Sequence, residues 1–129
     1  MIVDASALLA VLFDEHDAEN YARAISEAEV CRISAATFVE TSVAVESQTA
    51  DAGSRQWDAF LRSAGICIEP VTEEQAHAAR QAWSDFGKGR HPAGLNFADC
   101  FSYALAKVFD EPPLFKDQDF RKTGISAVL

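Results

Sequence analysis

The sequence predicts an α/β fold in which a short, mostly parallel sheet is covered by helices on both faces. Short apolar runs alternate along the chain with longer segments of helical spacing, a pattern typical of parallel sheets. The 129 residues are 49% hydrophobic and 24% charged, close to the averages for globular proteins. This length suits one compact domain, so we expect a single domain over residues 1–129.

The predicted strands are short apolar segments. They cover residues 1–3, 30–33, 66–69 and 114–115, with residues 127–129 as a fifth candidate. In a parallel sheet the carboxyl ends of the strands share one edge, and ligands bind beyond that edge. Polar residues directly after these strands are therefore the first candidates for a functional site.

Helical spacing fills the segments between the strands, and residues typical of helix ends mark their limits. Ser34, Thr72 and Asn96 are predicted N-caps, and Gly65 is a predicted helix stop. Residues 51–54 break one helical pattern, and the glycine-rich residues 87–94 (GKGRHPAG) are expected to form a loop. The expected helices cover approximately residues 6–12, 14–29, 35–47, 57–64, 73–86 and 97–109.

Composition excludes several classes of protein. The formal net charge of −9, from 20 acidic residues against 11 Lys and Arg, argues against a simple DNA-coating module. The sequence shows neither an apolar run long enough to span a bilayer nor a secretory signal, so the cytoplasm is the expected compartment. Cys31, Cys67 and Cys100 lack zinc-ligand spacing and are expected to be buried free thiols.

Acidic residues stand at the positions where a site is expected. Asp4 ends the first strand, Asp99 lies three residues after Asn96, and Asp117 follows the fourth strand, with Asp119 as an alternative. Each acid alone has an ordinary structural explanation as a helix cap or a turn residue. Their common position near one sheet edge is what indicates a functional site.

Glu40 is the fourth informative acid. By helical spacing it shares a face with Ala36, Val39, Val43 and Ala44, which we expect to point toward the core. A buried carboxylate is costly unless it is paired or binds a metal. A cluster of such acids would require cations, and oxygen ligands suit Mg²⁺ or Mn²⁺, which can polarise a phosphate and activate a water molecule.

Four segments of the chain carry a resemblance to a known family. The opening MIVDASALLA, the segment RISAATFVE, the segment GKGRHPAGLNFADCFSYALA and the closing LFKDQDF resemble the PIN-domain ribonucleases. More narrowly, the chain is similar to VapC-type toxins of type II toxin–antitoxin pairs. The resemblance covers essentially the whole chain and implies a PIN-like α/β/α sandwich.

The resemblance also implies a set of site residues. Asp4, Glu40 and Asp99 match the metal-binding, catalytic acids of the family, and Ser6 matches a hydroxyl residue often found beside them. The fourth acid matches Asp117. However, Phe115 stands where the family pattern has a hydroxyl residue, so Asp119 remains an alternative for the fourth acid. Asn96 is an accessory residue through its predicted cap.

The implied activity is Mg²⁺- or Mn²⁺-dependent endonucleolytic cleavage of RNA. The implied partners are an RNA substrate, a second copy of the chain in a homodimer, and a cognate VapB-type antitoxin that inhibits the enzyme. From the residues themselves, Lys88, Arg90 and Lys116 are candidates to bind RNA phosphates because they lie near the acids in the sequence.

Two interpretations remain beside this one. Exposed aromatic side chains could stack on RNA bases, but helical spacing favours a core or dimer-interface position for Trp57, Phe60, Trp83, Phe86, Phe97, Phe101 and Tyr103. The alternative function is a catalytically inert PIN-like interaction module with a degenerate metal site. Loss of nuclease activity on replacing Asp4 or Asp99 with asparagine separates an enzyme from such a module.

Overall fold

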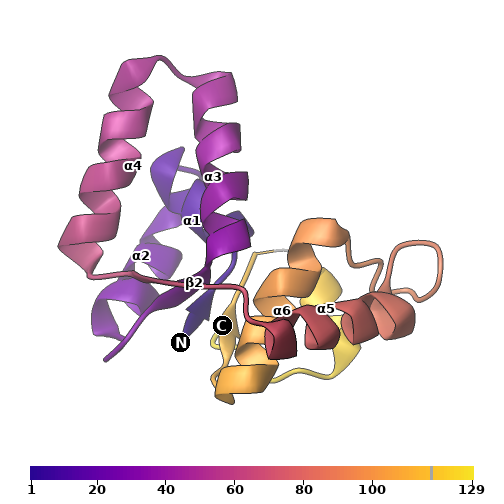
Figure 1. The fold of residues 1–129 in the computed structure, drawn as a ribbon. Helices are drawn as coiled ribbons and strands as arrows, with labels where there is room; N and C mark the ends of the chain where they lie inside the picture. Colours follow the sequence, from indigo (N-terminus) through magenta and orange to yellow (C-terminus); the bar gives the residue numbers. More distant parts are fainter. Residues whose placement is uncertain (117) are drawn as a thin grey trace.

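The computed structural model contains a four-stranded parallel sheet (Figure 1). It describes the backbone of every residue except 117 and the side chains of every residue except 117–119. The strand order is β3-β2-β1-β4. The strands are β1 (Ile2–Val3), β2 (Arg32–Ser34), β3 (Cys67–Glu69) and β4 (Pro113–Leu114). The predicted parallel α/β architecture is confirmed.

The predicted fifth strand at residues 127–129 is wrong. In this segment the Val128 amide donates a hydrogen bond to the Pro113 carbonyl at 3.1 Å, but no strand forms. Pro113 has no amide hydrogen to return to the incoming segment, so a ladder cannot continue along this side of β4.

The helices agree with the predicted order. They are α1 (Ala5–Leu12), α2 (Ala18–Glu27), α3 (Ala35–Gln48), α4 (Asp51–Ala64), α5 (Glu73–Phe86) and α6 (Phe97–Phe109), with a 3₁₀ helix η1 (Gln118–Thr123). The side chains of Ser34, Thr72 and Asn96 each accept a hydrogen bond from a backbone amide of the helix that follows, as predicted. Among the described residues, no helix is both long enough and apolar enough to cross a membrane.

One predicted break lies in the wrong place. Residues 51–54 form the first turn of α4, and the interruption falls just before it, at residues 49–50. Gly53 permits this close junction, because a Cβ at position 53 would lie only 1.9 Å from Oγ1 of Thr49.

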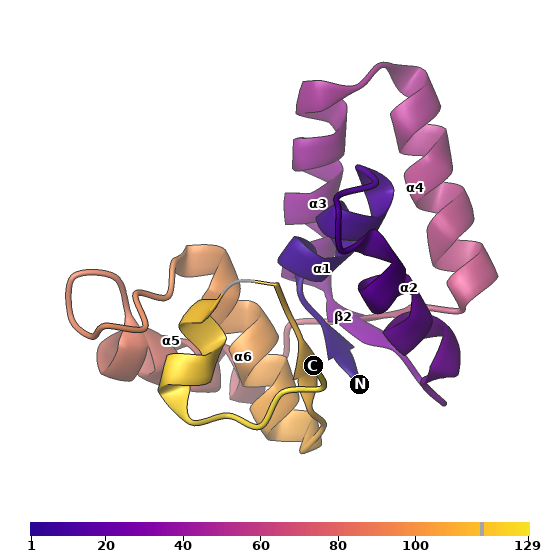
Figure 2. The same cartoon turned by 180° about the vertical axis from the view of Figure 1, so that it is seen from behind.

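The sheet separates two groups of helices. Helices α1 to α4 lie to one side, with α3 and α4 as a projecting hairpin, and α5, α6 and η1 lie to the other (Figures 1 and 2). Alternate strand residues point to opposite faces: Val3 packs in the core cluster of α1 and α2, whereas Ile2 packs against Leu105 and Ala106 of α6. This arrangement leaves the carboxyl edge of the sheet between the two helical groups.

The face of α3 that points inward differs from the predicted one. Thr37, Thr41 and Val45 are buried, whereas Val39 and Val43 are 57% and 58% exposed. The predicted core-facing stripe is therefore wrong for Val39 and Val43, whereas its other members, Ala36, Glu40 and Ala44, are half-buried. Threonine methyl groups fill the interior here, and their hydroxyls hide this from a hydrophobicity pattern.

Thr41 provides a test of stability. Its hydroxyl oxygen is buried and, within the described part of the chain, lacks a hydrogen-bond partner. A buried hydroxyl without a partner costs about 1–3 kcal/mol. We therefore expect Thr41→Val to raise the free energy of unfolding by about 1 kcal/mol in urea titrations. The matched variant Thr37→Val, which removes a bonded hydroxyl, is expected to lower it, and equal effects of the two changes would contradict this explanation.

The three cysteines do not share one environment. Cys31 and Cys100 are buried, as predicted, but Cys67 is exposed. Burial raises the pKa of the Cys31 thiol and raises that of Cys100 to about 11. Cys67 lies on β3, one of the two edge strands of the sheet.

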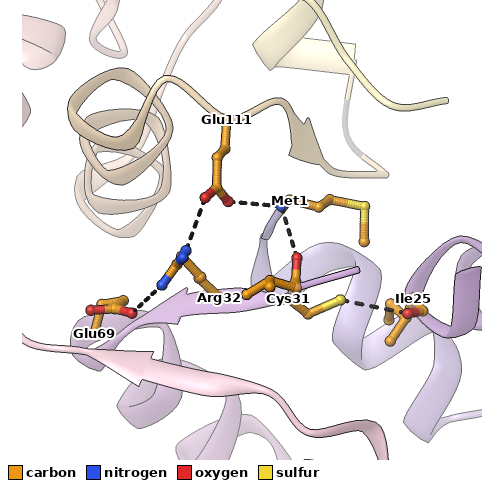
Figure 3. A network of polar contacts seen from close by, with 7 residues as sticks. Met1, Ile25, Cys31, Arg32, Glu69 and Glu111 are labelled. Carbon is orange, nitrogen blue, oxygen red and sulfur yellow. Dashed lines mark hydrogen bonds and ion pairs between the residues drawn. The ribbon is translucent and has the colours of Figure 1, made fainter. Parts of the chain in front are cut away.

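A network of polar contacts links the four strands near the end of the sheet where β1, β2 and β4 begin, opposite the carboxyl edge (Figure 3). The Met1 amine donates to Glu111 Oε2 at 2.8 Å and to the Val30 carbonyl at 2.9 Å. Arg32 donates to Glu111 Oε1 at 2.9 Å and to Glu69 Oε1 at 2.8 Å. These contacts link four short strands that share few backbone hydrogen bonds.

This network predicts that the stability of the protein depends on pH. Partial burial would raise the pKa of Glu111, but hydrogen bonds from the Met1 amine and Arg32 outweigh it and lower that pKa below 4.5. A lowered folded-state pKa contributes stability above the unfolded value, and that contribution is lost as the pH falls through the folded value. We expect Glu111→Gln to lower the free energy of unfolding by about 1 kcal/mol at pH 7, and by progressively less below about pH 4. Urea titrations of the wild type and the variant at pH 7 and below about pH 4 measure the change, with the exposed Glu29→Gln as the control. A stability difference between wild type and Glu111→Gln that does not change with pH would contradict this prediction.

Candidate active site

Asp4 occupies the carboxyl end of β1 and forms the N-cap of α1. It is only 3% exposed, and its backbone amide donates to the Leu114 carbonyl of β4 at 2.9 Å. Its Oδ2 accepts hydrogen bonds from the Ser6 amide at 3.1 Å and the Ser6 hydroxyl at 2.8 Å, and its Oδ1 accepts one from the Ser102 hydroxyl at 2.7 Å. All three donors are neutral, and a buried carboxylate so surrounded is a natural ligand for a cation.

A chain of hydroxyl groups holds Asp4 from two sides. Ser102 Oγ lies 3.2 Å from Thr37 Oγ1, and because the Ser102 hydrogen is given to Asp4, Thr37 must donate to Ser102. On the other side, the Ser6 hydroxyl accepts the Lys116 amide at 2.9 Å while donating to Asp4. Asp4 is therefore fixed by α1, α3, α6 and the segment after β4.

Sequence reasoning identified Ser6 but missed Ser102 and Thr37. Ser102 stands in an otherwise apolar stretch of α6, and its spacing of three residues from Asp99 places both side chains on one face of the helix. A polar residue at that spacing from a candidate acid was the available signal. Thr37 carries no comparable signal because its partner is 65 residues away.

Asp99 and Asn96 form a reciprocal cap at the start of α6. The backbone amide of Asn96 donates to Asp99 Oδ2 at 2.9 Å, and the backbone amide of Asp99 donates to Asn96 Oδ1 at 2.8 Å. Asp99 is 8% exposed. The predicted cap is confirmed, and it fixes the Asp99 carboxylate at the N-terminal end of α6, where the helix dipole favours negative charge.

Glu40 lies one turn beyond Thr37 on α3 and is half-buried. Asp99 lies one turn before Ser102 on α6, so Glu40 and Asp99 are each within one helical turn of the Thr37–Ser102 contact that supports Asp4. Within the described residues, no three acidic, histidine or cysteine side chains form a group that could hold a metal ion. Asp117 lies outside the described residues, as does the side chain of Asp119, and the four-acid site stays a prediction.

The predicted RNA-binding cations differ in their surroundings. The Lys116 ammonium pairs with Glu15 and, at 3.1 Å, with Asp17. The hydrogen bonds that the ammonium donates to these two carboxylates raise the pKa of Lys116. Lys88 and Arg90 are exposed in the loop of residues 87–94 and are accessible to phosphates.

The aromatic residues also divide into two sets. Trp57 is buried, as predicted for a core residue, and its Nε1 donates to Ser42 Oγ at 2.9 Å. Phe97 is 77% exposed and Trp83 is 37% exposed. The core interpretation is therefore wrong for Phe97, whose side chain lines an open apolar hollow beside α5.

The family model of the PIN domain matches residues 1–125. The chain belongs to the PIN domain family. Ribonuclease VapC28 of Mycobacterium tuberculosis is 50% identical over 130 residues, covering 100% of this chain and 98% of that protein. These matches place the chain among the VapC ribonucleases of the PIN domain family.

Solved structures support the PIN fold. The crystal structure of M. tuberculosis VapC20, described as a sarcin–ricin loop cleaving toxin, matches with a TM-score of 0.79 at 21% identity, covering 98% of this chain and 97% of that one. A toxin–antitoxin complex from Klebsiella pneumoniae matches with a TM-score of 0.70 at 17% identity, covering 92% and 88%. At these identities the similarity concerns the fold.

Proposed function

We propose that this PIN-domain protein is the toxin of a type II toxin–antitoxin pair and hydrolyses RNA in the cytoplasm with the help of a divalent cation. As a VapC ribonuclease the chain is an endoribonuclease. The observation that carries the metal dependence is the buried carboxylate of Asp4, held by neutral donors at the carboxyl edge of the sheet.

The residue types of the proposed site suit a hard cation. Asp4, Glu40, Asp99 and either Asp117 or Asp119 would hold it, and an all-oxygen set of this kind suits Mg²⁺ or Mn²⁺. When bound, such an ion acts as a Lewis acid toward phosphate and lowers the pKa of a water molecule. Ser6 and Ser102 orient the Asp4 carboxylate, and Asn96 orients that of Asp99.

The basic loop would contribute the binding of RNA. Lys88 and Arg90 would bind backbone phosphates and so offset the net charge of −9. Lys116 would have to exchange Glu15 and Asp17 for a phosphate, so we assign it a weaker role in binding.

The proposed protein partners are a cognate VapB-type antitoxin and a second copy of the chain. The fold shared with the toxin–antitoxin complex from K. pneumoniae supports an antitoxin partner. An Arg or Lys of the antitoxin would pair with the carboxylates of the site. Val39 and Val43, exposed on α3 on either side of Glu40, offer apolar contacts beside them.

A metal titration tests the proposed site. Mg²⁺ or Mn²⁺ is added to the wild type and to Asp99→Asn, and thermal unfolding is followed. At a concentration 100 times its dissociation constant, a ligand adds about 2.7 kcal/mol to stability. We expect the wild-type midpoint to rise and that of Asp99→Asn to rise much less. Equal shifts would contradict a cation site at Asp99, and a wild type that binds an antitoxin without cleaving RNA would favour the inert interaction module.

A further inference from the structure

An apolar groove lies between α5 and α6, beside the candidate active site. One hollow of about 300 Å³ is lined by Trp83, Phe97 and Phe101 together with Arg80. A second hollow of about 360 Å³ shares Trp83 and Phe97 and extends to Lys88 and Asn96. We call these six residues the aromatic groove.

The aromatic side chains of the groove contact one another and the backbone. The rings of Phe97 and Phe101 meet edge to face, with their centroids 5.0 Å apart. The Trp83 ring rests on the buried Gly87, where an added Cβ would lie 2.8 Å from ring carbons of Trp83. Fixed aromatic faces of this kind bind flat ligands with little loss of side-chain entropy.

The groove meets the proposed active site only at the N-terminal end of α6, through Asn96. Asn96 lines the groove and also binds the backbone amide of Asp99. Phe97 is the first residue of α6, and Asp99 is in the same turn. Because Phe97 and Asp99 are two residues apart, their side chains project from nearly opposite sides of α6, and a strand bound in the groove would pass around the N-terminal end of this helix to reach the acids.

The charge of the groove favours a negatively charged ligand. Among the residues that the structure describes, its lining includes two cations, Arg80 and Lys88, and no acidic residue, in a chain whose net charge is −9. Aromatic faces flanked by cations match the alternation of bases and phosphates in single-stranded RNA.

A second copy of the chain fits this charge less well. A two-fold interface sets the same patch of both copies face to face. Such an interface through the aromatic groove would bring the Arg80 and Lys88 side chains of two copies together, and like charges repel.

We propose that the aromatic groove is a base-binding subsite for the RNA substrate. A base next to the scissile phosphate stacks on Phe97 and Trp83, while Arg80 and Lys88 bind the adjoining phosphates. This inference rests on the proposed ribonuclease function and adds to it the means by which the strand is held.

The test uses a labelled, single-stranded 12-nucleotide RNA and a second probe of the same length with abasic positions. Binding is measured by anisotropy in EDTA, and KM and kcat are measured with Mg²⁺. We expect Phe97→Ala and Trp83→Ala to weaken binding of the normal probe roughly 5- to 100-fold, chiefly through KM. Phe97→Tyr and Trp83→Phe, which keep a ring, are expected to retain most of the affinity.

The abasic probe makes the test independent of whether the variants fold. Wild type is expected to bind it as weakly as Phe97→Ala binds the normal probe, and Phe97→Ala is expected to bind both probes alike. Arg80→Gln and Lys88→Gln are each expected to reduce the salt slope of log affinity by about 0.7. The exposed Val30→Ala, at the opposite edge of the sheet, is the control.

Three results would overturn the proposal. Equal affinity of the wild type for both probes, or unchanged KM in the alanine variants of an active enzyme, removes the base subsite alone. Conversion of a dimer to a monomer by Phe97→Ala, with KM following the dimer content in light scattering, assigns the groove to a second copy instead. A wild type that cleaves no RNA overturns both this inference and the proposed function.

Discussion

Replacing Asp4 with asparagine is expected to abolish measurable RNA cleavage while leaving the fold intact. The substitution removes one negative charge from the proposed cation site, and the loss of a single preorganised electrostatic group typically costs about 10²–10³ in rate. Asparagine is as good an N-cap as aspartate, so the Ser6 amide keeps its acceptor and α1 keeps its start. The measurement is single-turnover cleavage of a labelled RNA in Mg²⁺, together with urea unfolding.

The matched control for this variant is Asp58→Asn, which removes the same charge from an exposed position on α4. It is expected to keep wild-type activity. Asp4→Asn protein that is folded and cleaves at the wild-type rate would show that Asp4 is not part of the active site. Activity that survives both Asp4→Asn and Asp99→Asn would instead point to a contaminating nuclease.

The second large effect is expected from Ser102→Ala. Removal of this hydroxyl leaves Asp4 Oδ1 without its 2.7 Å donor and Thr37 without its acceptor. Residues that orient metal ligands typically contribute about 10–100-fold to metal affinity or activity. We expect a loss of this size in RNA cleavage at low Mg²⁺, with partial recovery as the Mg²⁺ concentration rises.

The dependence of RNA cleavage on Mg²⁺ concentration distinguishes a role of Ser102 in positioning Asp4 from a simple loss of stability. Ser47→Ala removes another hydroxyl that is bonded within α3, far from Asp4 in the sequence, and is expected to leave the Mg²⁺ profile unchanged. A Ser102→Ala enzyme with reduced activity but an unaltered Mg²⁺ profile would contradict a role through Asp4.

Local rules predicted the elements and part of the site. Helix caps involve residues two or three positions apart, so Ser34, Thr72 and Asn96 could be identified from sequence alone. The position of Asp4 after a buried strand could be identified in the same way. The parallel order of the strands follows from their alternation with helices.

The remaining features depend on which surfaces meet. The inward face of α3 carries Thr37 and Thr41, whose burial depends on contact with distant elements and not on their own polarity. Phe97 has the spacing of a core residue but is 77% exposed on the open side of the groove between α5 and α6. The missing fifth strand reflects one absent amide hydrogen at Pro113.

The hydroxyl chain around Asp4 restricts which residues can be exchanged at its positions. Ser6 and Ser102 each give one hydrogen and accept another at the same oxygen. Among small side chains only serine and threonine do both, since alanine does neither. Exchanges at positions 37 and 102 are therefore interdependent, because a residue at 102 that cannot accept leaves the donor at 37 without a partner. A library randomised at both positions and selected for RNA cleavage should return linked pairs.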